Sequence, residues 1–461
     1  MQTGRAKPLV TNATEQKREK SDMNSKFGNS GVNCSCGAVH EPTCVNAESA
    51  IDEAVNNAVL KTVFPDALQR RQVLKAVGAA TLLAAIGDLL PLSTLKAIAQ
   101  EKPKLEKTDI NVGFLGITCA TPLIMGVERG IFAKNGLKVS LQKIPGIGLI
   151  RDKMLNGELD VSQQVMPVAL ATTAGIGGSV VPTKVLTILN QHGNSLVLAM
   201  KHKNNRDPKN WKGFVFAVPF DTSHQTLQLR HYVAEAGLDP DKDIQYRVVP
   251  PSEYVSNLRV GNIDGFFGGE PGGQRAVFEG AGFIHLISKD IWEGHPCCSV
   301  TATDAWIKQN PNTFMAVFRS VIEAGIWSSK IENRPGLAKI LSRPDYVNAP
   351  EVVIEQVITG RYADGLGNVK DVPDRVKFDP FPHYSMAVWL STQMKRWNML
   401  TGDVNHKQLA QSVMLATDAT KIMAEQGVNL PAPSFRKERV LGKEFDSNEP
   451  EKYLSSLPRR G

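Results

Sequence analysis

The chain has 461 residues, of which 42% are hydrophobic and 21% charged, and its net charge is +7. This length allows two or three domains with a sizeable buried core. The basic residues are not clustered with aromatic residues in one stretch of the sequence, so nucleic acid is not an expected partner. No apolar run reaches the roughly 18–20 residues that a membrane-spanning helix needs.

Residues 1–69 form a polar lead with little hydrophobic patterning. They contain Cys34, Cys36, His40 and Cys44. Three thiols and one imidazole within eleven residues can bind zinc, although the Cys-x-Cys spacing is tighter than the usual ligand pair. The other interpretation is a disordered tail, and the sequence does not decide between the two.

Residues 70–99 contain the parts of an export signal. Arg70 and Arg71 are followed by Gln-Val-Leu-Lys and then by a mildly apolar stretch, 76–86. Ala97 and Ala99 give the small-x-small pattern of a signal-peptidase site. These parts resemble a twin-arginine signal, which predicts a periplasmic protein. The alternative is an internal amphipathic helix that carries two arginines.

From Asp109 onward, short apolar strands alternate with helix-length segments, which is typical of parallel α/β architecture. A helix is expected at 123–135, because Pro122 suits its first turn and Gly136 its C-terminal cap. Further helices are expected to begin at 146–148 and at Pro167. The expected strands are 110–115, 137–143, 159–165 and 185–189.

The alternation then restarts, which predicts a second, smaller lobe. Helices are expected at 225–236 and 250–260. The expected strands of this lobe are 214–218, 244–249, 263–267 and 283–287. The sequence is helical in pattern from 304 to 425, and residues 429–461, rich in proline and charge, are expected to wrap the surface as a C-terminal tail.

Four segments carry a family pattern. They are 120–133 (ATPLIMGVERGIFA), 160–167 (DVSQQVMP), 260–271 (VGNIDGFFGGEP), and His295-Pro296 followed by 303–306 (TDAW). Together they resemble the nitrate- and bicarbonate-binding periplasmic proteins of ATP-driven transporters. The resemblance extends over residues 110–397.

This resemblance implies an α/β fold of the periplasmic-binding-protein type, with two lobes, two hinge crossovers and a ligand site in the cleft. The crossovers are expected near 189–197 and 295–300. Lobe one would comprise 107–194 and 297–425, and lobe two 195–296. The implied protein is a monomer and not an enzyme. It holds a small anion without cofactor or metal and delivers it to an ABC transporter permease in the inner membrane.

Helices that begin at such a cleft direct free N–H groups and a partial positive charge toward an anion. Thr121 stands at one such start. Thr222 precedes another, where Ser223 and His224 are further donors or serve only to cap the helix.

The resemblance also assigns ligand contacts to a glutamine at the exit of the third strand and to a His-Gly pair at the first crossover. The glutamine corresponds to Gln163, with Gln164 as its rival, and the pair to His192 and Gly193. An imidazole can donate a hydrogen bond to an oxyanion. Alternatively, the Gln163 amide only binds the backbone, and His192 is a hinge residue whose hydrogen bonds are already satisfied within the protein.

The turn that contains Glu270 bears on which anion is bound. By the resemblance, nitrate binders carry lysine in this turn and bicarbonate binders carry glutamate. A buried carboxylate repels nitrate unless it is protonated or offset by a cation, so Glu270 favours bicarbonate. The alternative is that Glu270 only interacts with the dipole of the helix that follows it. The family's cleft tryptophan is also absent from 144–148, which predicts a roomier pocket. Nitrate or nitrite is the main prediction, and bicarbonate is the alternative.

Two other classes of function stay open. The same fold can serve as a pyrimidine-precursor-type enzyme, in which His295, Cys297 and Cys298 would hold iron, although adjacent thiols are an awkward ligand pair. A cytosolic nitrate sensor would require the export signal to be false. The sequence contains no P-loop, dinucleotide fingerprint or Ser-His-Asp pattern.

Overall fold

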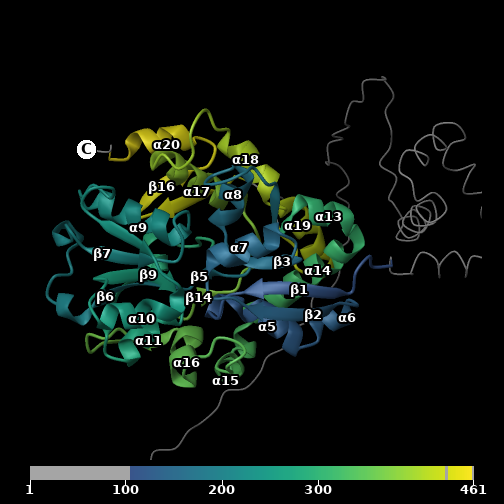
Figure 1. Cartoon of the computed structure of the whole chain (residues 1–461), viewed down its shortest axis with the longest axis horizontal. Helices are drawn as coiled ribbons and strands as arrows, with labels where there is room; N and C mark the ends of the chain where they lie inside the picture. The colour runs from purple at the N-terminus through teal and green to yellow at the C-terminus, as the bar shows by residue number, and fades with distance from the viewer. Residues whose placement is uncertain (1–103, 431–434, 459–461) are drawn as a thin grey trace, which may run out of the picture. The chain divides into compact units, whose positions relative to one another are not determined.

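The computed structural model describes residues 104–430 and 435–458. The cysteine-bearing lead and the signal at 70–99 lie outside these residues. Two five-stranded sheets with helices packed around them form the described body (Figure 1). Among the described helices, none is both long and apolar enough to cross a membrane.

The first sheet combines strands from two distant regions of the chain. β1 pairs in parallel with β2 and β3, whereas β11 lies antiparallel between β3 and β4. In sheet order the strands are β2 (Lys138–Lys143), β1 (Asp109–Phe114), β3 (Val161–Val165), β11 (Cys298–Thr303) and β4 (Thr183–Ile188). The sequence predicted four of these strands and parallel pairing. β11 begins inside the stretch that we expected to be the second crossover.

The second sheet has the same mixed arrangement. β7 pairs in parallel with β8 and β9, and β6 is antiparallel to β9 and β10. In sheet order the strands are β10 (Gly282–Ile287), β6 (Asn194–Ala199), β9 (Gly265–Gly269), β7 (Val215–Val218) and β8 (Gln245–Val248). β6 was not expected as a strand, because its residues fall partly in the predicted first crossover.

Helices around the first sheet complete the first lobe. The helix predicted over 123–135 is two helices, because Gly130 adopts a φ of +67° between them. This left-handed conformation interrupts the helical hydrogen-bond ladder. The elements are η1 (Thr118–Ala120), α5 (Thr121–Glu128), α6 (Ile131–Lys134), α7 (Ile147–Leu155), α8 (Pro167–Thr173), α13 (Asp304–Gln309), α14 (Pro311–Ser329), α18 (His406–Val413) and α19 (Ala416–Glu425).

The second lobe includes a segment from far along the chain. Residues 351–371, placed with lobe one by the sequence analysis, pack on α11 instead, where Gln274 Nε2 donates to Gln356 Oε1 at 3.0 Å. The buried ring of Tyr362 joins the core of this lobe, which explains the placement. The elements are α9 (His224–Glu235), η4 (Pro251–Glu253), α10 (Tyr254–Arg259), α11 (Gly272–Phe278), α12 (Ser288–Ile291), α16 (Glu351–Thr359), β12 (Arg361–Ala363) and β13 (Val369–Asp371).

Three segments cross between the lobes side by side. β5 (Gln191–His192) pairs with β14 (Val376–Lys377), and Gln191 forms a bridge with Pro296 on its other side. Two of these crossings lie within or beside the predicted hinge stretches. The third arises because the chain visits the second lobe again at 351–371.

The C-terminal residues form ordered elements that fasten onto both lobes, where a surface tail was expected. β15 (Lys437–Val440) and β16 (Lys443–Asp446) form a hairpin, followed by α20 (Pro450–Ser456). Glu438 accepts hydrogen bonds from Trp292 of the second lobe and Ser385 of α17 (Tyr384–Arg396). α17 itself contacts both α8 and α9.

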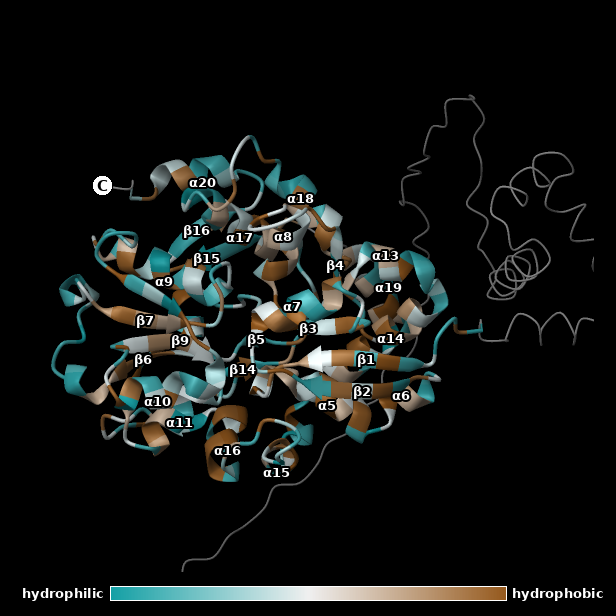
Figure 2. Ribbon diagram, in the orientation of Figure 1, coloured by the Kyte–Doolittle hydropathy of each residue, from teal (hydrophilic) through white to brown (hydrophobic). Residues whose placement is uncertain are grey.

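One large cluster of buried side chains runs through the first lobe, α17 and part of the second sheet. Trp389 of α17 belongs to this cluster, and its ring centroid lies 4.5 Å from that of Trp292 and 5.8 Å from that of His231. Figure 2 shows hydrophobic colouring in much of β7 and in part of β1, and many hydrophilic residues on α18 and α20. The two lobes therefore share one hydrophobic core beside the cleft.

Candidate functional site

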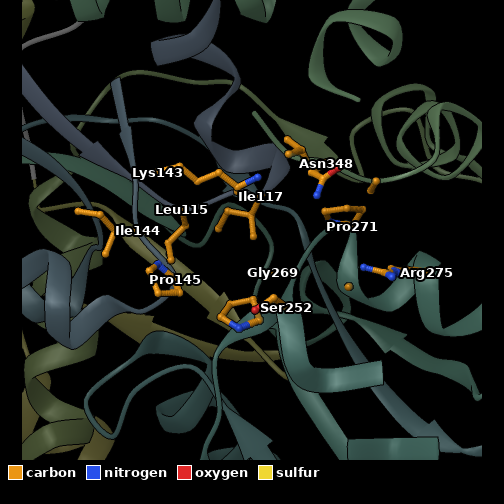
Figure 3. A pocket seen from close by; sticks show the side chains of 15 residues that line it. Leu115, Ile117, Lys143, Ile144, Pro145, Ser252, Gly269, Pro271, Arg275 and Asn348 are labelled. Carbon is orange, nitrogen blue, oxygen red and sulfur yellow. The ribbon is translucent and has the colours of Figure 1, made fainter. Parts of the chain in front are cut away.

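A cleft of about 420 Å³ lies between the two lobes. Its first-lobe wall comes from residues 115–117 and 143–145, which follow the carboxyl ends of β1 and β2. Its second-lobe wall comes from residues 251–252, Gly269, residues 271–272 and Arg275, and residues 347–349 form a third side (Figure 3). Ligands of open α/β sheets bind at the carboxyl ends of strands, so this is the expected place for a solute.

The charged residues that line the cleft are both cationic. They are Lys143 from the first lobe and Arg275 from the second, and the described lining contains no carboxylate. Lys143 Nζ donates to the carbonyl of Pro344 at 3.0 Å, and partial burial lowers the pKa of Lys143. Arg275 contacts Glu279 through Nε at 2.6 Å. The lining therefore favours an anion, and the sequence analysis named neither residue.

Glu270 does not turn its carboxylate into the cleft. Its neighbours Gly269 and Pro271 line the cleft, while the fully buried carboxylate pairs with Arg375. Ser195 Oγ also donates to this carboxylate, as does the backbone N–H of Gln274 at 3.1 Å. The Arg375 guanidinium lies 4.0 Å from the Tyr362 ring centroid. The cation that was required to offset Glu270 is thus supplied by the protein.

His192 occupies the first crossover with a φ of +61°. Its Nε2 accepts a hydrogen bond from Gly294 N at 2.7 Å, and its Nδ1 lies 2.9 Å from the carbonyl of Asp374. The first contact leaves the proton on Nδ1, which donates to Asp374. Burial lowers the pKa of His192, so the neutral ring is favoured. Both ring nitrogens are used to hold neighbouring hinge segments together.

Gly193 and Thr121 are also engaged within the protein. Gly193 has a φ of +78°, donates to Arg375 O at 2.9 Å and accepts from Glu270 N at 3.0 Å. Thr121 Oγ1 donates to Thr118 O at 2.6 Å and is fully buried. Both residues shape the surroundings of the cleft through backbone contacts.

Gln163 stands directly behind the cleft wall. Its Oε1 accepts from Leu115 N at 3.0 Å, and its buried Nε2 has no partner among the described residues. The rival Gln164 instead donates to Ser162 Oγ at 3.2 Å. Thr222 has a buried Oγ1 without a described partner, but it lines a separate pocket of about 320 Å³. The structure therefore does not bring the six predicted residues into one pocket.

Three buried thiols form a cluster that includes Cys119, two residues after Ile117 of the cleft wall. Cys119 Sγ is 3.4 Å from Cys297 Sγ, which is 3.8 Å from Cys298 Sγ. Asn194 Nδ2 donates to Cys297 Sγ at 3.3 Å. Burial raises a thiol pKa, but hydrogen bonds with the other two thiols, together with the electrostatic influence of the His224 imidazole, hold the pKa of Cys297 well below its usual value. Sequence reasoning named Cys297 and Cys298 as candidate metal ligands but missed Cys119, which is 178 residues from Cys297.

A model of the NMT1-like family matches residues 103–342, which is just over half of the chain. The chain belongs to the NMT1-like family. The nitrate/nitrite binding protein NrtA of Nostoc sp. is 29% identical over 389 residues, covering 78% of this chain and 88% of NrtA. The bicarbonate-binding protein CmpA of Synechococcus sp. is 27% identical over 396 residues, covering 77% of this chain and 87% of CmpA.

The crystal structure of the periplasmic nitrate-binding protein NrtA from Synechocystis PCC 6803 superposes with a TM-score of 0.73 at 27% identity. The alignment covers 77% of this chain and 99% of NrtA. This NMT1-like chain therefore has the two-lobed α/β fold of periplasmic binding proteins. The resemblance stated from the sequence is confirmed.

Proposed function

We propose that this NMT1-like protein is the solute-binding component of an ABC transporter and captures a small oxyanion, nitrate or nitrite, for uptake. The observation that carries the proposal is the cleft, whose two lobes each contribute one cation, Lys143 and Arg275. The likeness to NrtA, named as a nitrate/nitrite binding protein, supports this ligand class. Relatives named as binding proteins also favour binding over catalysis.

The anion would be held by charge-assisted hydrogen bonds from both lobes. A lysine Nζ and an arginine fork are strong donors to an oxyanion, and their opposite placement makes binding favour the closed arrangement. Gln163 would act from behind the cleft wall, because its Oε1 fixes the backbone of Leu115, which lines the cleft. His192 and Gly193 would act through the hinge, since their polar groups are already bonded.

Export by the twin-arginine route, a periplasmic location and delivery to an inner-membrane permease complete the proposal. They are supported by the signal pattern at 70–99 and by the relative named as periplasmic. Cell fractionation tests the location. Full-length protein retained in the cytoplasm would favour the sensor function instead.

Bicarbonate is the second candidate, because CmpA is nearly as similar to this chain as NrtA. Glu270 gives bicarbonate no advantage, since its charge is already offset by Arg375. Selection between the two anions would therefore fall to the other cleft residues. A direct comparison of the two ligands decides between them.

Calorimetry on the purified full-length chain tests the proposal with nitrate, nitrite, bicarbonate, cyanate and a sulfonate. We expect nitrate or nitrite to bind most tightly. The exchanges Lys143→Met and Arg275→Met should each weaken binding by about 1.5–3 kcal/mol, roughly tenfold to a hundredfold. Failure of every anion to bind at millimolar concentration would overturn the small-anion proposal.

Each variant has a matched control that removes the same charge. Lys138→Met lies on the same strand, with a side chain that is 86% exposed. Arg259→Met removes another arginine that pairs with Glu279. Both controls should bind as the parent does. Gln163→Ala should also weaken binding, and equal losses in the controls and the test variants would assign the effect to net charge alone.

A further inference from the structure

The three clustered thiols converge from separate elements. Cys119 lies in η1, Cys297 follows the second crossover, and Cys298 begins β11. Their Sγ atoms all lie within 4.8 Å of one another, and the three residues are fully buried. We propose that these thiols and the His224 imidazole form a binding site for a thiophilic d10 cation, Zn(II) or Cu(I). This site goes beyond the proposed anion-binding function.

The sulfur separations match those around such a cation. Zinc–sulfur bonds of about 2.3 Å at tetrahedral angles place the sulfurs about 3.8 Å apart. The distance from Cys297 Sγ is 3.4 Å to Cys119 Sγ and 3.8 Å to Cys298 Sγ. Small side-chain rotations would therefore bring the three sulfurs into coordination distance of one ion. The adjacent pair Cys297 and Cys298 can share an ion because both point into the cluster.

On the side of the second lobe, His224 is the proposed fourth ligand. His224 is the first residue of α9 and is fully buried, and neither ring nitrogen has a hydrogen-bond partner among the described residues. Buried polar atoms are rarely left unpaired, because each costs free energy when it is removed from water. The His224 ring packs against that of His295, which lies two residues before Cys297 in the chain, so a cation in the cluster would be within reach of the imidazole.

His295 gives the site a second available imidazole. Its ring centroid lies 5.2 Å from that of His224. Nδ1 is within 3.1 Å of Pro296 O, while the buried Nε2 has no partner in the described part of the chain. The chemistry of the set, three sulfurs and an imidazole, suits zinc and monovalent copper, whereas magnesium and calcium prefer oxygen ligands.

Two amides orient the cluster for negatively charged sulfur. Asn194 Oδ1 accepts from Gln225 Nε2 at 2.9 Å, which turns Asn194 Nδ2 toward Cys297 Sγ. Outer-shell donors of this kind stabilise the thiolate form of a metal ligand. Binding would release the thiol protons to solvent and join Cys119 of the first lobe to His224 of the second.

Metal titration of the reduced full-length chain tests this site. The background carries Cys34→Ser, Cys36→Ser and Cys44→Ser, because the lead also contains thiols. Co(II) serves as the spectroscopic probe, and Zn(II) and Cu(I) are added in competition with chelators. We expect one ion per chain, a near-ultraviolet thiolate-to-cobalt band, and a rise in Tm with the preferred cation.

Variants within the cluster then assign the ligands. Cys119→Ser, Cys297→Ser and His224→Asn should each weaken binding at least tenfold and reduce the cobalt band or the Tm rise. If the Cys297→Ser variant has a native Tm and still binds one ion, Cys297 is not a ligand and the proposed site is wrong. The proposal would also be overturned if the reduced parent protein bound no ion. The same holds if the thiols did no more than form a Cys119–Cys297 disulfide when an oxidant is added. Thiol alkylation that the cation blocks in the folded parent gives a second measurement should a variant fail to fold.

Discussion

Replacing Arg375 with methionine should lower the free energy of unfolding by about 3–5 kcal/mol, because it leaves a buried charge without a partner. Arg375 and Glu270 both have side chains with no exposed surface. In the variant, the Glu270 carboxylate keeps only its hydrogen bonds from Ser195 and from the backbone of Gln274. Gln274 Oε1 also loses its donor, which Arg375 Nη1 supplies at 2.7 Å.

Urea unfolding followed by circular dichroism gives the free energy for the parent, Arg375→Met, Glu270→Met and the double variant. The double variant should recover most of the loss, since a buried ion pair can be replaced by apolar side chains of similar volume at little cost. The exposed pair of Lys437 and Glu444 is the control, and Lys437→Met should change stability by less than about 1 kcal/mol. A loss below 1 kcal/mol for Arg375→Met, or a double variant as unstable as the sum of the single ones, would refute the reasoning.

Three further changes test other parts of the fold by the same unfolding measurement. Asp160→Asn should cost about 1–3 kcal/mol, because the carboxylate accepts four hydrogen bonds, and a loss within error would show that they contribute nothing. Gly360→Ala should cost about 2 kcal/mol or more, because φ is +78° and the new Cβ would lie 1.9 Å from Val372 O; an unchanged Tm would contradict this. Burial lowers the pKa of His383 to about 4, so between pH 6.5 and 4 the unfolded chain binds more protons and stability falls as the pH is lowered. His383→Phe should therefore reduce the stability lost between pH 7 and pH 5 by about 2 kcal/mol, whereas an identical pH dependence would show that His383 does not contribute.

The strands and helices of the α/β alternation were predicted well because each has a local signal. The expected strand 110–115 is β1 at Asp109–Phe114, and the expected helix 225–236 is α9 at His224–Glu235. Apolar runs bounded by proline and glycine determine such elements through local sterics and burial. β6 and β11 were not predicted, because their residues were assigned to the crossovers on the basis of the family pattern. Their antiparallel pairing depends on contacts with strands far away in the sequence.

The site shows the same division between local and non-local information. The sequence indicated a cleft and helix starts, but it did not show that Glu270 would meet Arg375, which is 105 residues further along the chain. Nor did it bring Cys119 to Cys297, or Lys143 opposite Arg275. These pairings depend on the topology of the fold, and no local pattern in a single sequence indicates them.

The fastening of the lobes by α17 and the C-terminal hairpin has a consequence for ligand release. Opening the cleft would strain the bonds from Glu438 to Trp292 and Ser385, and the pair between Lys443 and Glu235. A solute held between lobes that are tied in this way would therefore leave slowly from the isolated protein. Rapid unloading would then depend on a docking partner that pulls the lobes apart, so the membrane transporter would control the timing of release.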